Sequence, residues 1–218
     1  MADEFIQFLK EKPEIASFVD EIIGSPEIIP KLIEIIKTEK GSVKFYCQKA
    51  IRFASEKKPE LVYPYFYDIA SFIDSDNSFI KWGGIITLSN LASVDDYNKF
   101  KSISKKYFSF LHSDSMITAN NVAENAHKFV EKDPKYEKII TNEMFKIKEN
   151  TYLHKGEVSP ECKNIMLGSA IEYFDKVFDI SESKKEMLEF AEAEVKNTRK
   201  KVAKTAEDFI NKHHLKKE

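Results

Sequence analysis

A turn followed by an apolar segment recurs along the chain at nearly constant intervals, and this recurrence constrains the fold more than any other feature. The clearest copy spans residues 72–91, where an apolar segment ends, an Asp/Asn/Ser turn follows, and a second apolar segment begins. The related triplets have central residues 37, 37, 45 and 36 positions apart: Ser42-Val43-Lys44, Phe79-Ile80-Lys81, Met116-Ile117-Thr118, Glu161-Cys162-Lys163 and Asn197-Thr198-Arg199. A recurrence at this period is typical of stacked helical units.

The apolar residues between these turns follow a helical spacing, as in residues 14–23 with Ile15, Phe18, Val19 and Ile22. Similar stripes predict helices over residues 3–11, 26–38, 43–56, 60–73, 78–92, 97–111, 115–131, 135–150, 160–178, 183–195 and 197–213. Five prolines stand where such segments begin, at first-turn positions that tolerate a missing N–H: Pro13, Pro26, Pro59, Pro134 and Pro160. No stretch alternates long enough to predict a strand, so we predict an all-α fold. The longer interval predicts an insertion around residues 152–158, which include Gly156.

The period, the two helices per unit and a proline in the first helix resemble HEAT repeats. The match is closest at Asp76-Asn77-Ser78-Phe79-Ile80-Lys81, an acidic residue followed by an apolar–basic pair. In that family such residues form an ionic ladder between neighbouring repeats. The resemblance places Lys44, Lys81, Lys163 and Arg199 at the basic position, from which Thr118 departs.

The resemblance implies a right-handed α–α superhelix, a HEAT-like α-solenoid of about six antiparallel helix pairs forming one domain over residues 1–218. Solenoid ends need polar caps. We expect residues 1–24 to form an N-terminal capping pair, and residues 196–218 to form a C-terminal capping helix with a basic tail.

Charge and cysteine content narrow the possible partners and location. The net charge is −2, and Arg52 and Arg199 are the only arginines, which argues against non-specific nucleic-acid binding as the main activity. Cys47 and Cys162 form no CxxC pattern, so we expect buried, reduced thiols and a cytoplasmic protein. No apolar run is long enough to span a bilayer and no secretory signal opens the chain, so no membrane association is predicted.

Enzyme signatures are missing from the sequence. It contains no Walker loop, GxGxxG, GxSxG or HExxH motif. No His, Cys or carboxylate pair has metal-ligand spacing on one helical face. We therefore expect no enzymatic activity, no catalytic residues, no metal and no cofactor.

Trp82-Gly83-Gly84 is the most unusual local sequence, because two glycines inside a helix cost about 2 kcal/mol relative to alanines. One interpretation is close helix packing, with the glycines making room for Tyr46 or another bulky side chain. The other is a notch, floored by glycine and walled by Trp82, that accepts a partner's side chain. A separate cluster nearby raises a similar question, since Tyr63 and Tyr67 are expected on the side of their helix opposite the core.

Two functional hypotheses follow. The first is a non-enzymatic scaffold whose concave surface, made by the second helices, holds a protein or peptide; its candidate residues are Lys44, Lys81, Trp82, Gly83, Gly84, Asn121, Lys163 and Arg199. The second is a DNA-binding protein or an alkylated-base DNA glycosylase, because a family of such bacterial enzymes is built on HEAT-like repeats. That alternative requires a cationic groove with a carboxylate at its base. The basic row of Lys196, Lys200 and Lys204 is a further place where an acidic partner or phosphates would bind.

Overall fold

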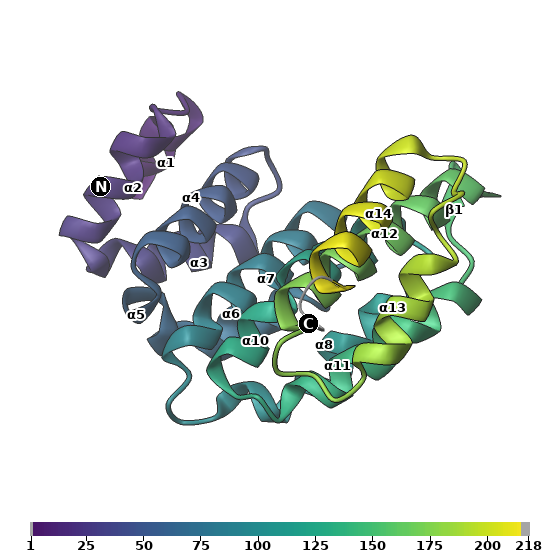
Figure 1. Cartoon of the computed structure of the whole chain (residues 1–218). Coiled ribbons are helices and arrows are strands. Elements are labelled where there is room, and N and C mark those ends of the chain that lie inside the picture. The colour runs from purple at the N-terminus through teal and green to yellow at the C-terminus, as the bar shows by residue number, and fades with distance from the viewer. Residues whose placement is uncertain (1, 215–218) are drawn as a thin grey trace. The chain divides into compact units, whose positions relative to one another are not determined.

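The structure is a computed structural model that describes residues 2–214 (Figure 1). The chain divides into two compact units, Met1–Ile103 (unit 1) and Ser104–Glu218 (unit 2). Nearly all the regular structure is helical, which confirms the all-α prediction. The basic tail expected at the end of the chain extends into residues 215–218, outside the described residues.

Unit 1 begins with two short helices, α1 (Ala2–Lys10) and α2 (Ile15–Gly24). A 3₁₀ turn, η1 (Pro26–Ile28), leads into α3 (Ile29–Thr38), and residues 39–42 join α3 to α4 (Val43–Lys57). The next pair is formed by α5 (Pro59–Val62), η2 (Tyr63–Tyr65) and α6 (Phe66–Phe72), followed by α7 (Ser78–Leu91). Two 3₁₀ turns, η3 (Ala92–Val94) and η4 (Lys99–Ser102), end the unit.

Unit 2 continues the alternation of shorter and longer helices. Its first part contains α8 (Ser104–Ser109), η5 (Phe110–His112), α9 (Met116–Asn125) and α10 (His127–Lys132). It goes on with α11 (Tyr136–Phe145), η6 (Lys146–Glu149), the strands β1 (Leu153–His154) and β2 (Glu157–Val158), and α12 (Pro160–Val177). The last two helices are α13 (Lys184–Glu192) and α14 (Lys200–His214).

Three of the recurring turns provide a side chain that caps the following helix, whereas Ser42, which precedes α4, makes no such hydrogen bond. The Asn77 side chain accepts hydrogen bonds from the backbone N–H groups of Phe79 and Ile80, at 3.1 and 3.3 Å. Ser115 and Ser159 cap α9 and α12 in the same way. Such caps satisfy backbone donors that the first helical turn leaves without partners. At α7, α9 and α12 the recurring turn therefore supplies the polar side chain that starts the second helix of the pair.

Prolines begin or interrupt several of the helices. Pro26, Pro59 and Pro160 occupy the first position of their elements, as predicted, whereas Pro13 and Pro134 lie two residues before α2 and α11. The predicted helix over residues 60–73 is divided into α5, η2 and α6. Pro64 lies inside η2, where it supplies no backbone N–H and so prevents a continuous α-helical ladder.

A small hairpin corrects the prediction that the chain contains no strand. Leu153 pairs with Val158, and His154 pairs with Glu157, in the segment where we expected the insertion. Lys155 and Gly156 both have positive φ, 53° and 85°, as a type I′ turn requires. A two-residue strand has no period long enough to recognise, which is why the sequence pattern missed it.

The second helices of successive pairs, α4 and α7 in unit 1 and α12 and α14 in unit 2, pack side by side and run in the same direction. Three contacts join α4 to α7 in ascending order along both helices: Phe45 with Phe79, Gln48 with Gly83, and Ser55 with Asn90. In unit 2, α12 packs beside α14 (Figure 1) through Gly168 with Val202 and Asp175 with His213. This arrangement leaves one side of each row of second helices facing solvent.

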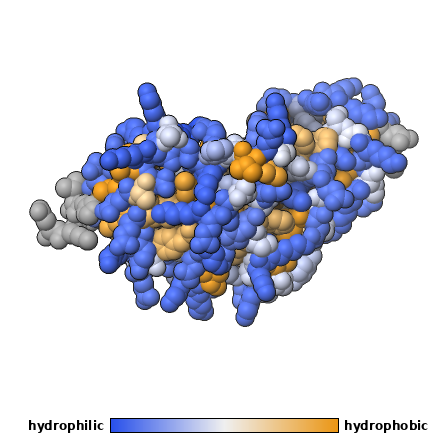
Figure 2. Space-filling view, turned by 90° about the vertical axis from the view of Figure 1, so that its right-hand side faces the viewer, coloured by the Kyte–Doolittle hydropathy of each residue, from blue (hydrophilic) through white to orange (hydrophobic). Residues whose placement is uncertain are grey.

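The apolar core of each unit lies between its helices. Cys47 and Cys162 are buried free thiols, as predicted, and burial raises the pKa of Cys47 to about 12. Hydrophilic residues cover most of the face shown in Figure 2, with hydrophobic residues in small groups between them. Among residues 2–214, none of the helices combines the length and the apolar character needed to cross a bilayer.

Candidate functional site

The two glycines of α7 are packing positions. A Cβ on Gly83 would lie 1.3 Å from Nε2 of Gln48, so the Gln48 side chain occupies the space that the glycine leaves. A Cβ on Gly84 would lie 2.9 Å from the Cβ of Phe72. Tyr46, one of the bulky side chains considered for this gap, instead donates a hydrogen bond to the carbonyl oxygen of Pro13 at 2.8 Å. The geometry therefore supports the packing interpretation, because Gln48 and Phe72 fill what would be the floor of a notch.

Trp82 belongs to a row of aromatic side chains that reach solvent. Its ring contacts Phe79 at 5.3 Å between centroids, and Phe79 contacts Phe45 of α4 at 5.7 Å. Phe79 is 64% exposed, and Trp82 and Phe45 are half-buried. Phe79, Trp82 and Ile86 follow an i, i+3, i+7 spacing, so they share one side of α7.

Cationic side chains accompany these rings on α4. Lys49 and Arg52 lie over the ring of Phe53, at 5.7 and 4.8 Å from its centroid. The i, i+4, i+7, i+8 spacing of α4 residues 45, 49, 52 and 53 places them on one side of that helix. We call the following set the α4–α7 face: Phe45, Lys49, Arg52, Phe53, Phe79, Trp82 and Ile86. Sequence reasoning missed most of this set, although its spacing on the side of α4 opposite the core stripe was a usable signal.

Two of the predicted lysines lie at the border of this face. Lys44 is half-buried and its ammonium lies 5.3 Å from the centroid of Phe45. Lys81 directly precedes Trp82, which turns its side chain about 100° around the helix. Both are half-buried, and neither shares the spacing that defines the face.

The other predicted residues lie in unit 2. Asn121 is half-buried on α9, Lys163 is half-buried in the first turn of α12, and Arg199 directly precedes α14. Arg199 forms an ion pair with Glu161 in the first turn of α12, which joins the starts of two successive second helices. Asn164 reinforces this junction through hydrogen bonds with Thr198 and Asn197, at 3.0 and 3.1 Å.

The row of second helices in unit 2 carries both signs of charge. Lys212 pairs with Asp175 at 2.7 Å, and Lys201 lies 3.6 Å from Glu172. A hollow of about 400 Å³ between α12 and α14 includes these two carboxylates, Lys212 and the ring of Phe209 in its lining. The result is a mixed polar surface, unlike the aromatic and cationic α4–α7 face.

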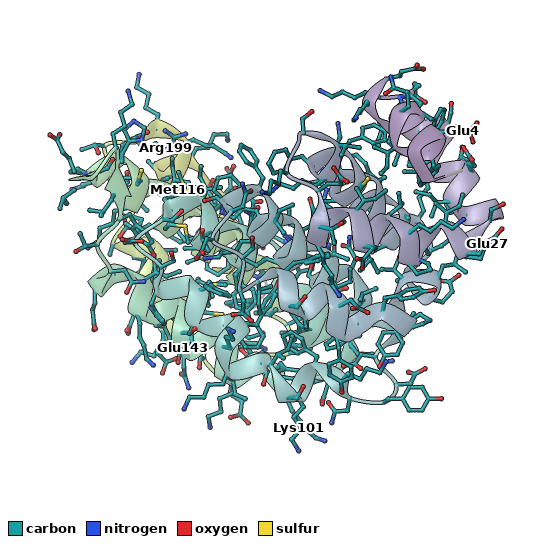
Figure 3. All side chains as sticks on the ribbon, turned by 180° about the vertical axis from the view of Figure 1, so that it is seen from behind. Glu4, Glu27, Lys101, Met116, Glu143 and Arg199 are labelled. Carbon is teal, nitrogen blue, oxygen red and sulfur yellow. The ribbon has the colours of Figure 1, made fainter. Side chains whose placement is uncertain are left out.

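His112 and His213 of unit 2 contact neighbouring polar groups. In His112, Nε2 lies 2.6 Å from Oε2 of Glu143 and Nδ1 lies 3.1 Å from Oδ1 of Asn150, so both ring nitrogens have partners. Figure 3 shows Glu143 well separated from Arg199, which places this network away from the turn junction. Nε2 of His213 lies 2.7 Å from Asp175. These contacts hold helices together and leave His112 without a free nitrogen for proton transfer.

His127 gives unit 2 a defined pH response. Burial, followed by the charges of Lys176 and Lys128, lowers the pKa of His127 to about 4, against about 6.5 in an unfolded chain. The unfolded state therefore takes up the proton first, and the free energy of unfolding should fall as pH drops from about 6.5 toward 4. Urea unfolding at about pH 7 and pH 5 should show a smaller decline for His127→Gln than for the wild type. An equal decline in the free energy of unfolding of both proteins would contradict the lowered pKa of His127.

Comparison with known proteins gives no assignment of this arrangement. No family model matches the chain, and no curated protein is significantly similar to it. In the part of the chain that the structure describes, no three His, Cys, Asp or Glu side chains come together in a way that would hold a metal ion.

Proposed function

We propose that this chain is a non-enzymatic protein-binding scaffold. In this proposal the helix pairs form a single HEAT-like α-solenoid of about six pairs, capped at both ends. The second helices provide the binding surface, and the α4–α7 face is its main contact. The buried free thiols of Cys47 and Cys162 support a cytoplasmic location.

The exposed aromatic row is the observation that carries the proposal. Aromatic and arginine side chains dominate the binding energy of protein interfaces, and the α4–α7 face combines both. Phe79 and Trp82 would receive a bulky apolar side chain, while Lys49 and Arg52 would pair with carboxylates beside it. The expected ligand is therefore an acidic segment with an aromatic or aliphatic anchor. The same-direction packing of second helices within each unit is consistent with the stacking of solenoid repeats.

The charge distribution gives less support to the nucleic-acid alternative. Lys212 and Lys201 of unit 2 are balanced by Asp175 and Glu172, and on α4 Glu56 follows Arg52 by one turn. A DNA glycosylase of the kind considered would need a basic groove. Bases do stack on aromatic side chains, however, so the test includes a single-stranded oligonucleotide.

Selection from a displayed library of random short peptides tests the proposal. The full chain should enrich peptides that place an aromatic or aliphatic residue beside Asp or Glu. Phe79→Ser and Arg52→Glu should each weaken binding of a selected peptide by about tenfold or more, as interface anchors do. Fluorescence anisotropy of the labelled peptide provides the measurement.

Tyr97→Ser is the matched control, because Tyr97 is 83% exposed in the same unit but lies outside the α4–α7 face. It should leave peptide affinity unchanged. Failure to enrich any sequence class, or equal binding by Phe79→Ser, would refute the proposal. Binding of a single-stranded DNA oligonucleotide in place of peptides would favour the alternative.

A further inference from the structure

The ammonium group of Lys99 lies among three aromatic rings of unit 1. Its Nζ is 4.4 Å from the ring centroid of Tyr63, 5.6 Å from that of Tyr67 and 6.0 Å from that of Phe66. Cations are attracted to aromatic faces at these distances. We call these three rings, from η2 and the first turn of α6, the aromatic cage.

The cage has two fixed walls and one open wall. Tyr63 is 8% exposed, which corrects the expectation that it lies on the outer side of its helix, and Phe66 is fully buried. Tyr67 is 62% exposed, and its ring stands nearly perpendicular to that of Phe66 at 5.4 Å. The interior is therefore preformed, while the Tyr67 side gives access from solvent.

Asp95 fixes both the cage and the backbone of Lys99. Its carboxylate accepts a hydrogen bond from the Tyr63 hydroxyl. It also accepts hydrogen bonds from the backbone N–H of Lys99 at 2.8 Å and from the backbone N–H of Phe100 at 2.9 Å. The preceding Asn98 adopts a left-handed conformation, φ 55°, which turns the chain back toward the cage. Only the flexible stem of Lys99 then connects its ammonium to this anchored backbone.

We propose that the aromatic cage is a binding site for quaternary ammonium groups, and that Lys99 is its built-in competitor. Aromatic cages recognise such groups through cation–π attraction. A lysine ammonium is compact and strongly hydrated, so it loses more hydration in a cage than a trimethylammonium group does. Tethering compensates by giving Lys99 a high effective concentration at the site.

Displacement of Lys99 costs little elsewhere, because its structural hydrogen bond is made by the backbone N–H. A ligand entering past Tyr67 would replace the lysine ammonium, which would move into solvent. The apparent affinity of the wild type is then reduced by the fraction of molecules in which Lys99 fills the cage.

Titration of the full chain with two trimethylammonium probes tests this inference. Choline represents a free small molecule, and N-acetyl-trimethyllysine amide represents a modified protein side chain. Lys99→Ala should bind at least one probe about tenfold more tightly than the wild type, because the tethered competitor is gone. Tighter binding of the lysine derivative would identify a methylated protein as the source of the ligand, and tighter binding of choline would identify a small molecule.

Two controls separate cation recognition from general hydrophobic binding. The neutral choline isostere 3,3-dimethylbutanol should bind Lys99→Ala much more weakly than choline does. Adding Tyr67→Leu to Lys99→Ala should remove binding, whereas adding Tyr97→Leu should leave it unchanged. The inference fails if a folded Lys99→Ala variant binds neither cation, or binds the neutral isostere equally well. It does not depend on the α4–α7 face, so either proposal can fail alone.

Discussion

Phe174→Ala is expected to lower the free energy of unfolding of unit 2 by about 3–5 kcal/mol. Phe174 is fully buried on α12 and contacts Phe145 at 5.1 Å and Phe190 at 5.2 Å between ring centroids. Removing its ring would take away apolar burial and leave a cavity between α11, α12 and α13. Rigid neighbouring helices collapse into such a cavity only in part, which adds to the cost.

Far-UV circular dichroism during urea unfolding follows the helices of both units, so the unit 2 transition is obtained by comparison with a signal from unit 1 alone. The only tryptophan, Trp82, lies in unit 1, so its fluorescence provides that second signal. Ile180→Ala is the control, because Ile180 is in unit 2 but 58% exposed, and it should change stability by less than about 0.5 kcal/mol. A loss below about 1 kcal/mol for Phe174→Ala would contradict the packing described for this cluster.

Gly84→Ala is expected to destabilise unit 1 by about 1–3 kcal/mol. In an exposed helix the same substitution would stabilise by about 1 kcal/mol, so the sign of the effect is diagnostic. Here the new methyl group would lie 2.9 Å from the Cβ of Phe72 and 3.3 Å from the backbone nitrogen of Ile73. Neither atom can move without shifting α6. Thermal unfolding followed by Trp82 fluorescence would show a lower melting temperature.

Gly83→Ala provides the contrasting case, because its methyl group would overlap only the end of the flexible Gln48 side chain. Gly83→Ala alone should destabilise by displacing the Gln48 amide from its packed position. In a Gln48→Ala background the same substitution should be neutral or stabilising, since the space is then open. Additive effects of the two substitutions would show that Gln48 is not the obstacle. Unchanged melting temperatures with lost peptide binding would restore the notch interpretation.

The sequence predicted the helices and their starting points because both depend on local chemistry. The apolar stripe of residues 14–23 and the cap at Asn77 each need only a few neighbouring residues. The short break between α9 and α10 at Ala126 is not marked by any helix-breaking glycine or proline in the local sequence. The predicted helix over residues 115–131 therefore included it.

The binding surfaces were harder to predict because they combine residues distant in sequence. Phe45 contacts Phe79, and Lys99 contacts Tyr63, only after the helix pairs have formed. The sequence did single out Trp82, yet its glycine neighbours are explained by Gln48 and Phe72, which periodicity cannot place beside them. The predicted set of eight residues is also divided between the two units, with Lys44, Lys81, Trp82, Gly83 and Gly84 in unit 1 and Asn121, Lys163 and Arg199 in unit 2.

The hairpin between η6 and α12 has a consequence for how this chain can change in length. Its base is secured by Tyr152, which is fully buried, and by the hydrogen bond from Leu153 N–H to the Asp114 carbonyl at 2.8 Å. Its tip, Lys155-Gly156, is exposed and bears no part of the core. Residues added there would lengthen the turn without altering how α12 packs on α9. The hairpin is thus a place where evolution, or a fluorescent-domain fusion, can add sequence, whereas the turns before α7, α9 and α12 are held by helix caps.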